Sequence, residues 1–127
     1  MLLDIREVHR IAKAWIEMHR LPEDSQEREA EFWAFERLSN LVQDDPEEAW
    51  KVIEAMRRLD GTDSILANIA AGPLEDLLVY HGDKFIDRFE LLARDDQQFR
   101  KMLGAVWQNN MSDILWTRVK AIAAPPW

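Results

Sequence analysis

The segment Ile65–Gly82, with the sequence ILANIAAGPLEDLLVYHG, constrains the fold more than any other part of the chain. Two short apolar patterns of helical type meet in it at Gly72-Pro73, and the second pattern reaches His81-Gly82. Glycine favours the end of a helix, whereas proline favours the first turn, where its missing N–H would have no partner. The segment therefore predicts that one short helix ends and another begins at Gly72-Pro73.

Apolar residues recur at helical spacing along the whole chain. They occupy positions i, i+3, i+4 and i+7 at Val8, Ile11, Ala12 and Trp15, and again at Phe99, Met102, Leu103 and Val106. Such a pattern is typical of amphipathic helices, and no stretch alternates apolar and polar residues as a strand would. We expect an all-α fold of about eight short helices.

Capping residues and prolines predict where these helices begin and end. The expected boundaries are Leu21-Pro22 after the first helix, Asp24 or Ser25 before the second, Asp45-Pro46 before the third with Asp45 as the capping acid, Asp60-Gly61 after it, Asp63 or Ser64 before the fourth, and about 113–123 for the last. The tail Pro125-Pro126-Trp127 follows as a short extended segment that docks on the body or engages a partner.

A weak internal similarity suggests how the helices are arranged. Residues 36–45 and 87–96 align without a gap, and each copy ends at a double aspartate where one helix gives way to another. Pairs of helices of this size fit a HEAT-like stack, with an irregular bundle as the alternative. We expect a single compact domain over residues 1–127. Its parts are an N-terminal helix (1–22), a central region (32–107), and a C-terminal helix with its PPW tail (112–127).

The charge distribution bears on the kind of partner. The net charge is −8, and residues 23–63 contribute all of it, with thirteen acidic and five basic side chains. Binding to a phosphate backbone requires the opposite sign, so we expect no nucleic-acid partner. A concentrated acidic surface attracts a basic protein, although it can equally serve solubility alone.

Motifs for catalysis or metal binding are absent from the sequence. The chain has no cysteine, no nucleophile elbow and no glycine-rich phosphate loop. His9 and His19 lie ten residues apart and neither has a ligand partner at i+4, so we expect no metal and no cofactor. No stretch approaches the length needed to span a membrane, and no secretory signal is evident, so we expect a cytoplasmic location.

The second expected helix has a polar face that includes an aromatic residue. Its apolar stripe consists of Ala34, Phe35, Leu38, Leu41 and Val42, and Trp33 points away from the centre of that stripe, beside Glu36, Arg37 and Asn40. Tryptophan beside charged groups is typical of an interaction hot spot. An inner helix covered on both faces is the alternative. The candidate partner-binding residues are Trp33, Glu36, Arg37, Asp44, Asp45, Glu47 and Glu48.

Glu75, Asp76 and His81 form an alternative candidate site for acid–base chemistry or ligand binding. Their separations of five and six residues do not place them on one helix face. A structural explanation is available for each, because acids favour the first turn of a helix and histidine the last turn. His81 also continues the apolar stripe of its helix.

Five segments resemble one family. They are FWAFERL (32–38), DDPEEAW (44–50), LANIAAGPLEDLL (66–78), HGDKFIDRFELLARDD (81–96) and FRKMLGAVW (99–107). Over residues 32–107 the chain resembles small bacterial proteins that share a domain of unknown function numbered 6869. The resemblance implies an all-helical bacterial domain and brings no activity with it. The matching polar positions are Glu36, Arg37, Glu75, Asp76, His81 and Asp87.

Three hypotheses for function follow from the sequence. The first is a non-enzymatic protein-binding module, one version of which is an acidic immunity protein that neutralises a basic toxin domain. The second is a small enzyme or ligand-binding protein that uses Glu75, Asp76 and His81. The third is an accessory subunit that associates with itself as a homo-oligomer. A toxin reading frame beside the gene would favour the first hypothesis.

Overall fold

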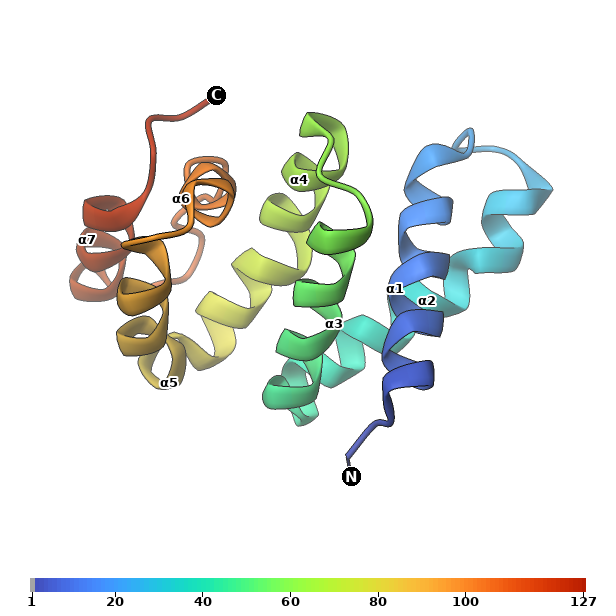
Figure 1. Cartoon of the computed structure of the whole chain (residues 1–127), viewed down its shortest axis with the longest axis horizontal. Coiled ribbons are helices and arrows are strands. Elements are labelled where there is room, and N and C mark those ends of the chain that lie inside the picture. Colours follow the sequence, from blue (N-terminus) through green and yellow to red (C-terminus); the bar gives the residue numbers. More distant parts are fainter. Residues whose placement is uncertain (1) are drawn as a thin grey trace. The chain divides into compact units, whose positions relative to one another are not determined.

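The computed structural model of this chain describes residues 2–127, and these residues form helices and no strands (Figure 1). The elements are α1 (Ile5–Arg20), α2 (Gln26–Asp44), α3 (Pro46–Leu59), α4 (Asp63–Ile69), the π-helical turn η1 (Ala70–Leu74), α5 (Glu75–Ala93), α6 (Gln97–Leu103) and α7 (Asp113–Ile122). The all-α prediction is therefore confirmed. Within residues 2–127, no helix combines the length and the apolar content that crossing a membrane requires.

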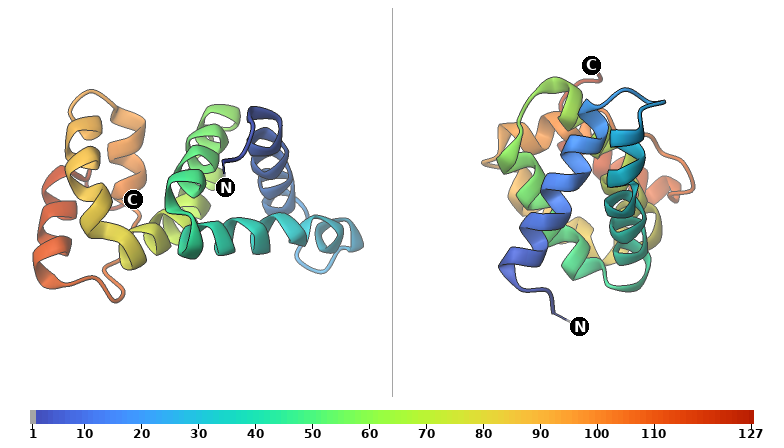
Figure 2. Two further views of the ribbon diagram at one scale, coloured as in Figure 1. Left: turned by 90° about the horizontal axis from the view of Figure 1, so that it is seen from below. Right: turned by 90° about the vertical axis from the view of Figure 1, so that its right-hand side faces the viewer.

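The contacts of the backbone divide the chain into two units, unit 1 (Met1–Asn68) and unit 2 (Ile69–Trp127). In unit 1, the helices α1, α2 and α3 each pack against the other two (Figure 2). The buried side chains between them include Ile11 and Trp15 from α1, Leu38 from α2, and Ile53 and Met56 from α3. Unit 1 therefore has a core of its own, and the prediction of a single domain stays a prediction.

Local capping explains where the helices of unit 1 begin. The side chain of Asp4 accepts a hydrogen bond from the N–H of Glu7 (2.9 Å), and Ser25 accepts one from Arg28 (3.1 Å). α3 begins at Pro46 as predicted, but the side chain of Asp45 makes no capping hydrogen bond there. Proline alone marks that start, since its fixed φ suits the first helical position.

The predicted break at Gly72-Pro73 is wrong, because residues 63–93 are helical throughout. α4 leads directly into η1, in which the N–H of Glu75 bonds the carbonyl oxygens of Ala70 and Gly72. A π turn changes which carbonyl oxygen each N–H reaches. A proline inside it therefore disturbs the backbone hydrogen bonds less than it would in a regular α-helix. The sequence suggested that Glu75 and Asp76 lie at an open helix N-terminus. Because the helix is continuous here, they do not.

α5 also continues through His81-Gly82, where the second predicted helix was to end. His81 has non-helical dihedral angles (φ −138°, ψ 22°), so α5 is kinked there rather than terminated. Gly82 is buried, and a Cβ on it would lie 2.3 Å from Cδ2 of Leu115 on α7. The glycine allows α7 to approach the kink closely.

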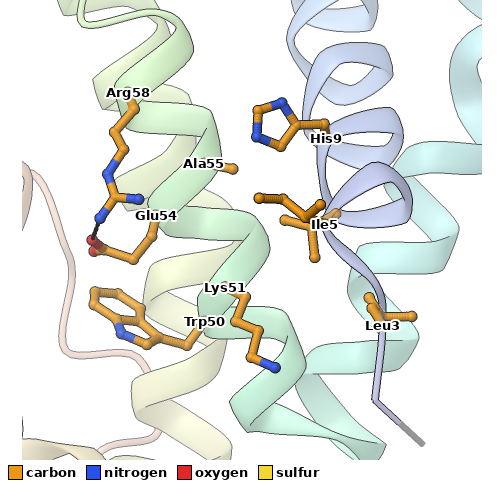
Figure 3. A pocket seen from close by; sticks show the side chains of 9 residues that line it. Leu3, Ile5, His9, Trp50, Lys51, Glu54, Ala55 and Arg58 are labelled. Carbon is orange, nitrogen blue, oxygen red and sulfur yellow. Dashed lines mark hydrogen bonds and ion pairs between the residues drawn. The ribbon is translucent and has the colours of Figure 1, made fainter.

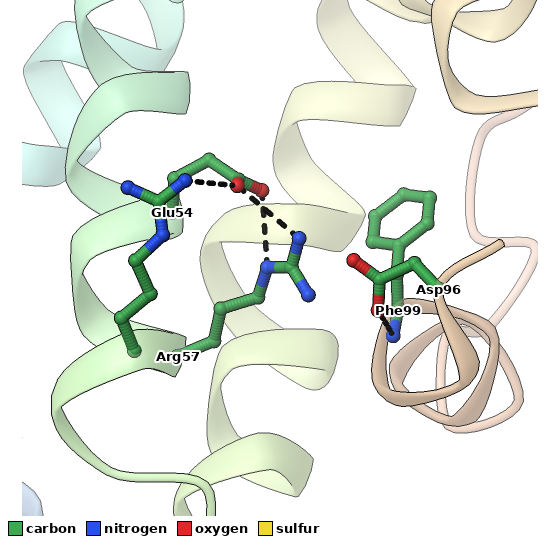
Figure 4. A network of polar contacts seen from close by, with 5 residues as sticks. Glu54, Arg57, Asp96 and Phe99 are labelled. Carbon is green, nitrogen blue, oxygen red and sulfur yellow. Dashed lines mark hydrogen bonds and ion pairs between the residues drawn. The ribbon is translucent and has the colours of Figure 1, made fainter. Parts of the chain in front are cut away.

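Unit 2 is built around aromatic contacts between α5 and α6. The ring centroids of Phe85 and Phe89 are 5.5 Å apart, and those of Phe89 and Phe99 are 5.0 Å apart in an edge-to-face arrangement. Asp96 caps α6 by accepting a hydrogen bond from the N–H of Phe99 at 2.9 Å (Figure 4). α7 packs against both helices and is capped by Ser112.

The C-terminal tail lies along α6. Nε1 of Trp127 donates a hydrogen bond to the carbonyl of Lys101 (2.6 Å), and the N–H of Ala124 donates to that of Arg100 (2.9 Å). A Cβ on Gly104 would come within 2.7 Å of the carbonyl oxygen of Ala124, so only glycine permits this approach. Of the two alternatives for the PPW tail, the structure shows docking on the body.

Candidate protein-binding surface

Two phenylalanines project from the outward face of α2. Phe32 is 45% exposed and Phe35 is 41% exposed, and their rings stack with centroids 5.3 Å apart. They lie three residues apart, so both occur on one side of the helix. Of the apolar stripe identified in the sequence, Ala34, Leu38, Leu41 and Val42 are buried, whereas Phe35 is exposed.

Acidic side chains flank this aromatic pair. Glu29 precedes Phe32 by three residues and Glu36 follows it by four, so both carboxylates share its face. Both glutamates are exposed. We call Glu29, Phe32, Phe35 and Glu36 the α2 surface. It combines exposed aromatic area with negative charge.

Most of the acidic residues of the segment 23–63 point outward. The exposed ones are Glu23, Asp24, Glu27, Glu29, Glu36, Asp44, Glu47 and Asp63. Three others are engaged within unit 1. Glu54 pairs with Arg57 (3.0 Å; Figure 4) and with Arg58 (3.4 Å), Asp60 pairs with Arg20, and Glu48 pairs with Lys51 (3.0 Å). Internal ion pairs therefore neutralise only part of the acidic segment.

Trp33 lies at the junction of α1 and α2 and is half-buried. The guanidinium of Arg10 covers its ring, 4.2 Å from the centroid, and Arg10 donates two hydrogen bonds of 3.0 Å to the carboxylate of Glu7. The hydrogen bond from Arg10 lowers the pKa of Glu7, and the charge of the half-buried Arg37 acts in the same direction. Trp33 thus takes part in the contact between the two helices.

Glu48 requires a correction, since it was expected on the partner-binding surface. Only 1% of it is exposed, and its carboxylate accepts a hydrogen bond from the N–H of Leu3 (2.8 Å) and pairs with Lys51 (3.0 Å). The N-terminal segment folds over it. Of its neighbours in the predicted set, Asp44 and Glu47 are exposed and Asp45 is half-buried.

A groove of about 550 Å³ runs along α1 and α3 (Figure 3). Ile5 and His9 point from α1 toward Ala55 on α3, and Trp50 lies farther along the lining. The charged side chains of the groove already have partners, since Lys51 pairs with Glu48 and Arg58 with Glu54. The groove therefore presents mainly apolar surface.

His19, the second histidine of α1, packs against Trp15 of the same helix. The imidazole of His19 stacks on Trp15 with centroids 3.8 Å apart, and its Nδ1 lies 2.9 Å from the carbonyl oxygen of Trp15. Burial lowers the pKa of His19, the hydrogen bond to Trp15 opposes that change, and the charge of Arg28 adds to it. Among residues 2–127, no three histidine or acidic side chains cluster as a metal site would require.

The alternative site, Glu75, Asp76 and His81, is divided between two environments. The carboxylate of Glu75 accepts hydrogen bonds from the N–H of Trp107 (2.8 Å) and from Nδ2 of Asn109 (3.2 Å), which fixes the loop after α6. His81 lines a hollow of about 260 Å³ at the kink of α5, and neither Glu75 nor Asp76 lines that hollow. This hollow is therefore not shared by the three groups.

Asp76 nevertheless has a perturbed carboxyl group. Burial raises its pKa, and the neighbouring charge of Glu75 raises it further. A raised carboxyl pKa can mark a functional group, but here the two acids are simply adjacent in sequence and partly withdrawn from water. Burial and the adjacent charge account for the raised pKa of Asp76.

Two contributors to the surface of unit 1 were not evident from the sequence. Phe32 escaped attention because it lies outside the apolar stripe, although its spacing of three residues from Phe35 signals an aromatic pair. Arg10 could not be assigned to Trp33 from the sequence, because the two residues lie on different helices and meet only in the folded unit.

Comparison with known proteins identifies a family. The profile of a family of unknown function (DUF6869) matches residues 21–126, a longer stretch than the resemblance over residues 32–107. None of the curated proteins and none of the solved structures matches this chain.

Proposed function

The chain belongs to the DUF6869 family, whose function is unknown, and we propose that it is a non-enzymatic protein-binding module for a basic protein partner. The observation that carries the proposal is the α2 surface, where two stacked and exposed phenylalanines lie between two exposed glutamates. Large exposed aromatic side chains supply binding energy when a partner covers them. Flanking carboxylates select a partner of opposite charge and speed its approach.

Charge supports the choice of a basic partner. Unit 1 has sixteen acidic and nine basic side chains, which gives −7, whereas unit 2 has eight and seven, which gives −1; together they make the −8 of the chain. The negative field therefore originates in unit 1, which also carries the α2 surface. A protein with a positively charged face would be steered toward it.

An immunity protein is the specific version of this proposal. In that version the partner is a toxin domain with a basic cleft, and the α2 surface covers the cleft. Asp44 and Glu47, exposed at the corner between α2 and α3, would extend the contact. The bacterial source, the cytoplasmic location and the HEAT-like arrangement of the helices stay predictions within this proposal. A toxin gene next to the coding sequence would support it.

Photo-crosslinking in the organism that carries this gene would test the proposal. A benzophenone amino acid replaces Phe35 in one variant, and it replaces Lys120, an exposed residue of α7, in the control variant. We expect the Phe35 position, and not the control position, to capture a basic protein. Capture of the same proteins from both positions would contradict the proposal.

Charge reversal then tests the electrostatic part with the purified partner. The double variant Glu29→Lys/Glu36→Lys should lower the association rate at low salt, and the difference from the wild type should shrink as salt screens the charges. Asp83→Lys, an exposed acid of unit 2, serves as the matched reversal. Equal association rates for the wild type and the double variant would exclude a role of the α2 surface in steering.

A further inference from the structure

Trp107, in the loop between α6 and α7, is 76% exposed and is among the most exposed large apolar side chains of unit 2. A single exposed apolar residue is common on protein surfaces. Here, however, hydrogen bonds to and from side chains order the loop that carries the indole. That combination indicates a side chain displayed for contact.

Hydrogen bonds hold this loop at the tryptophan and at the two residues that follow it. Glu75 accepts from the N–H of Trp107 (2.8 Å) and from Nδ2 of Asn109 (3.2 Å). Nε2 of Gln108 donates to the carbonyl of Met111 (3.1 Å) and to the carboxylate of Asp113 (2.8 Å). A backbone that is already ordered loses little entropy when its side chain is bound. Trp107 is thus pre-organised as an anchor.

A receptor for such an anchor lies at the other end of the same loop. The hollow at the kink of α5, about 260 Å³, is lined by residues 78–84 and 110–112 and by Leu115. Leu78, Val79 and Met111 supply apolar walls, while Asn110 and Ser112 supply oxygen atoms that an indole N–H can reach. His81, Asp83 and Lys84 also line the hollow, so it offers an indole both apolar contact and polar partners.

The position of the hollow favours a second copy of this chain as the source of the tryptophan. Trp107 precedes Asn110 by three residues, so at most about 11 Å of extended chain separates the anchor from the edge of the hollow. When an anchor and its receptor lie this close on one face, a two-fold axis lets each copy fill the hollow of the other.

Charge and neighbouring apolar area agree with this partner. Unit 2 has a net charge of only −1, so two copies of it repel each other weakly, whereas two copies of unit 1 at −7 would repel strongly. Tyr80, which lines the hollow, is 57% exposed, and Ile114, next to Leu115, is 79% exposed. Both would add apolar area to the contact.

We propose that the chain forms a two-fold symmetric dimer through unit 2, in which Trp107 of each copy inserts into the hollow lined by Val79, Met111 and Leu115 of the other. The indole is buried against apolar side chains, and its N–H donates to a polar atom at the rim. The proposed contact uses residues of unit 2, whereas the α2 surface belongs to unit 1.

Sedimentation equilibrium of the full chain tests the dimer across a roughly hundredfold range of concentration. We expect a monomer–dimer equilibrium in the wild type. Trp107→Ala should raise the dimer dissociation constant at least about tenfold, as the loss of an aromatic anchor does. Leu91→Ala removes another exposed apolar side chain of α5 that does not line the hollow, and it should leave the constant unchanged.

A second variant acts on the receptor and keeps the anchor. Val79→Phe fills the hollow and should weaken the dimer as Trp107→Ala does. An equimolar mixture of the two variants should dimerise more strongly than either alone, because Trp107 of one variant meets the intact hollow of the other. Circular dichroism verifies that each variant is folded. A monomeric wild type at every concentration, or a mixture no stronger than the single variants, would overturn the proposal.

Discussion

Arg20, at the end of α1, forms an ion pair with the carboxylate of Asp60, which follows α3 and is 6% exposed. The two residues are forty positions apart, so the pair ties the end of the first helix to the end of the third. Asp60 also accepts a hydrogen bond from the N–H of Thr62 (2.9 Å) and so shapes the turn into α4.

We expect Arg20→Met to destabilise the protein by about 1–2 kcal/mol, because it leaves a largely buried carboxylate without its cation while Thr62 still solvates it. The value lies below that of a fully buried pair, because the side chain of Arg20 is 57% exposed. Urea unfolding followed by circular dichroism measures the change. Arg6→Met, at an exposed position of α1, is the control and should stay within about 0.5 kcal/mol of the wild type. A similar loss in both variants would assign the effect to the helix rather than to the pair.

Stability should fall as the pH drops into the acid range. The hydrogen bond from the N–H of Leu3 lowers the pKa of Glu48 against the effect of burial. Burial raises the pKa of Asp60, but the hydrogen bonds from Thr62 and Arg20 outweigh it, so this pKa also lies below its usual value. Both carboxyls bind protons less tightly in the folded chain, so their contribution is complete above about pH 5 and is lost as the pH falls through the folded pKa values. In the variant Glu48→Gln/Asp60→Asn, the free energy of unfolding should fall less steeply as the pH drops below about 5. An unchanged dependence of this free energy on pH would contradict the role given to the two carboxyls.

Asp76 should behave in the opposite way. Burial and the charge of Glu75 raise the pKa of Asp76, so its ionised form is less favourable in the folded chain than in the unfolded one. Stability therefore decreases as the pH rises from the pKa of Asp76 in the unfolded chain through its higher pKa in the folded chain. Asp76→Asn is therefore expected to raise the melting temperature at pH 7 and to change it little at acid pH, where the carboxyl is already neutral. Asp83→Asn, at an exposed acid of the same helix, should have no effect at either pH. A lower melting temperature for Asp76→Asn at pH 7 would show that its carboxylate makes a favourable contact.

The close approach of Leu115 to Gly82 predicts that the effect of Gly82→Ala on stability depends on the side chain at position 115. Gly82→Ala places a methyl group against the side chain of Leu115, and we expect a loss of about 1 kcal/mol. In a Leu115→Ala background the same substitution should be neutral or stabilising, because the space is then open. Gly72→Ala, which meets nothing within 4 Å, is the matched control and should stabilise by about 0.4–1 kcal/mol. Equal effects of Gly82→Ala in both backgrounds would exclude the steric explanation.

Local signals in the sequence predicted much of the fold. Ser25, Pro46 and Ser112 mark helix starts through interactions within a few residues, so the sequence suffices to place them. Gly72-Pro73 predicted a new helix start, because proline favours the first turn, whereas here Pro73 is buried inside a π turn. Whether such a turn forms depends on the packing of its neighbours, and no short sequence pattern reports that packing.

The candidate surface was predictable only in outline. The acidic character of residues 23–63 is a property of composition and was evident. The burial of Glu48 depends on Leu3, forty-five positions away, and the exposure of Phe35 depends on which side of α2 the other helices cover. Both are consequences of tertiary packing, so the sequence could indicate an acidic protein-binding surface without locating its aromatic centre.

The affinity of the captured basic protein for alanine variants of the α2 surface tests the central claim most directly. Isothermal titration calorimetry should show that Phe32→Ala/Phe35→Ala weakens binding by at least about 2 kcal/mol, close to thirtyfold, because the aromatic anchors are lost. Ile5→Ala, a 74% exposed apolar residue of the same unit, should bind as the wild type does. Undiminished affinity of the phenylalanine variant for the verified partner would contradict the account.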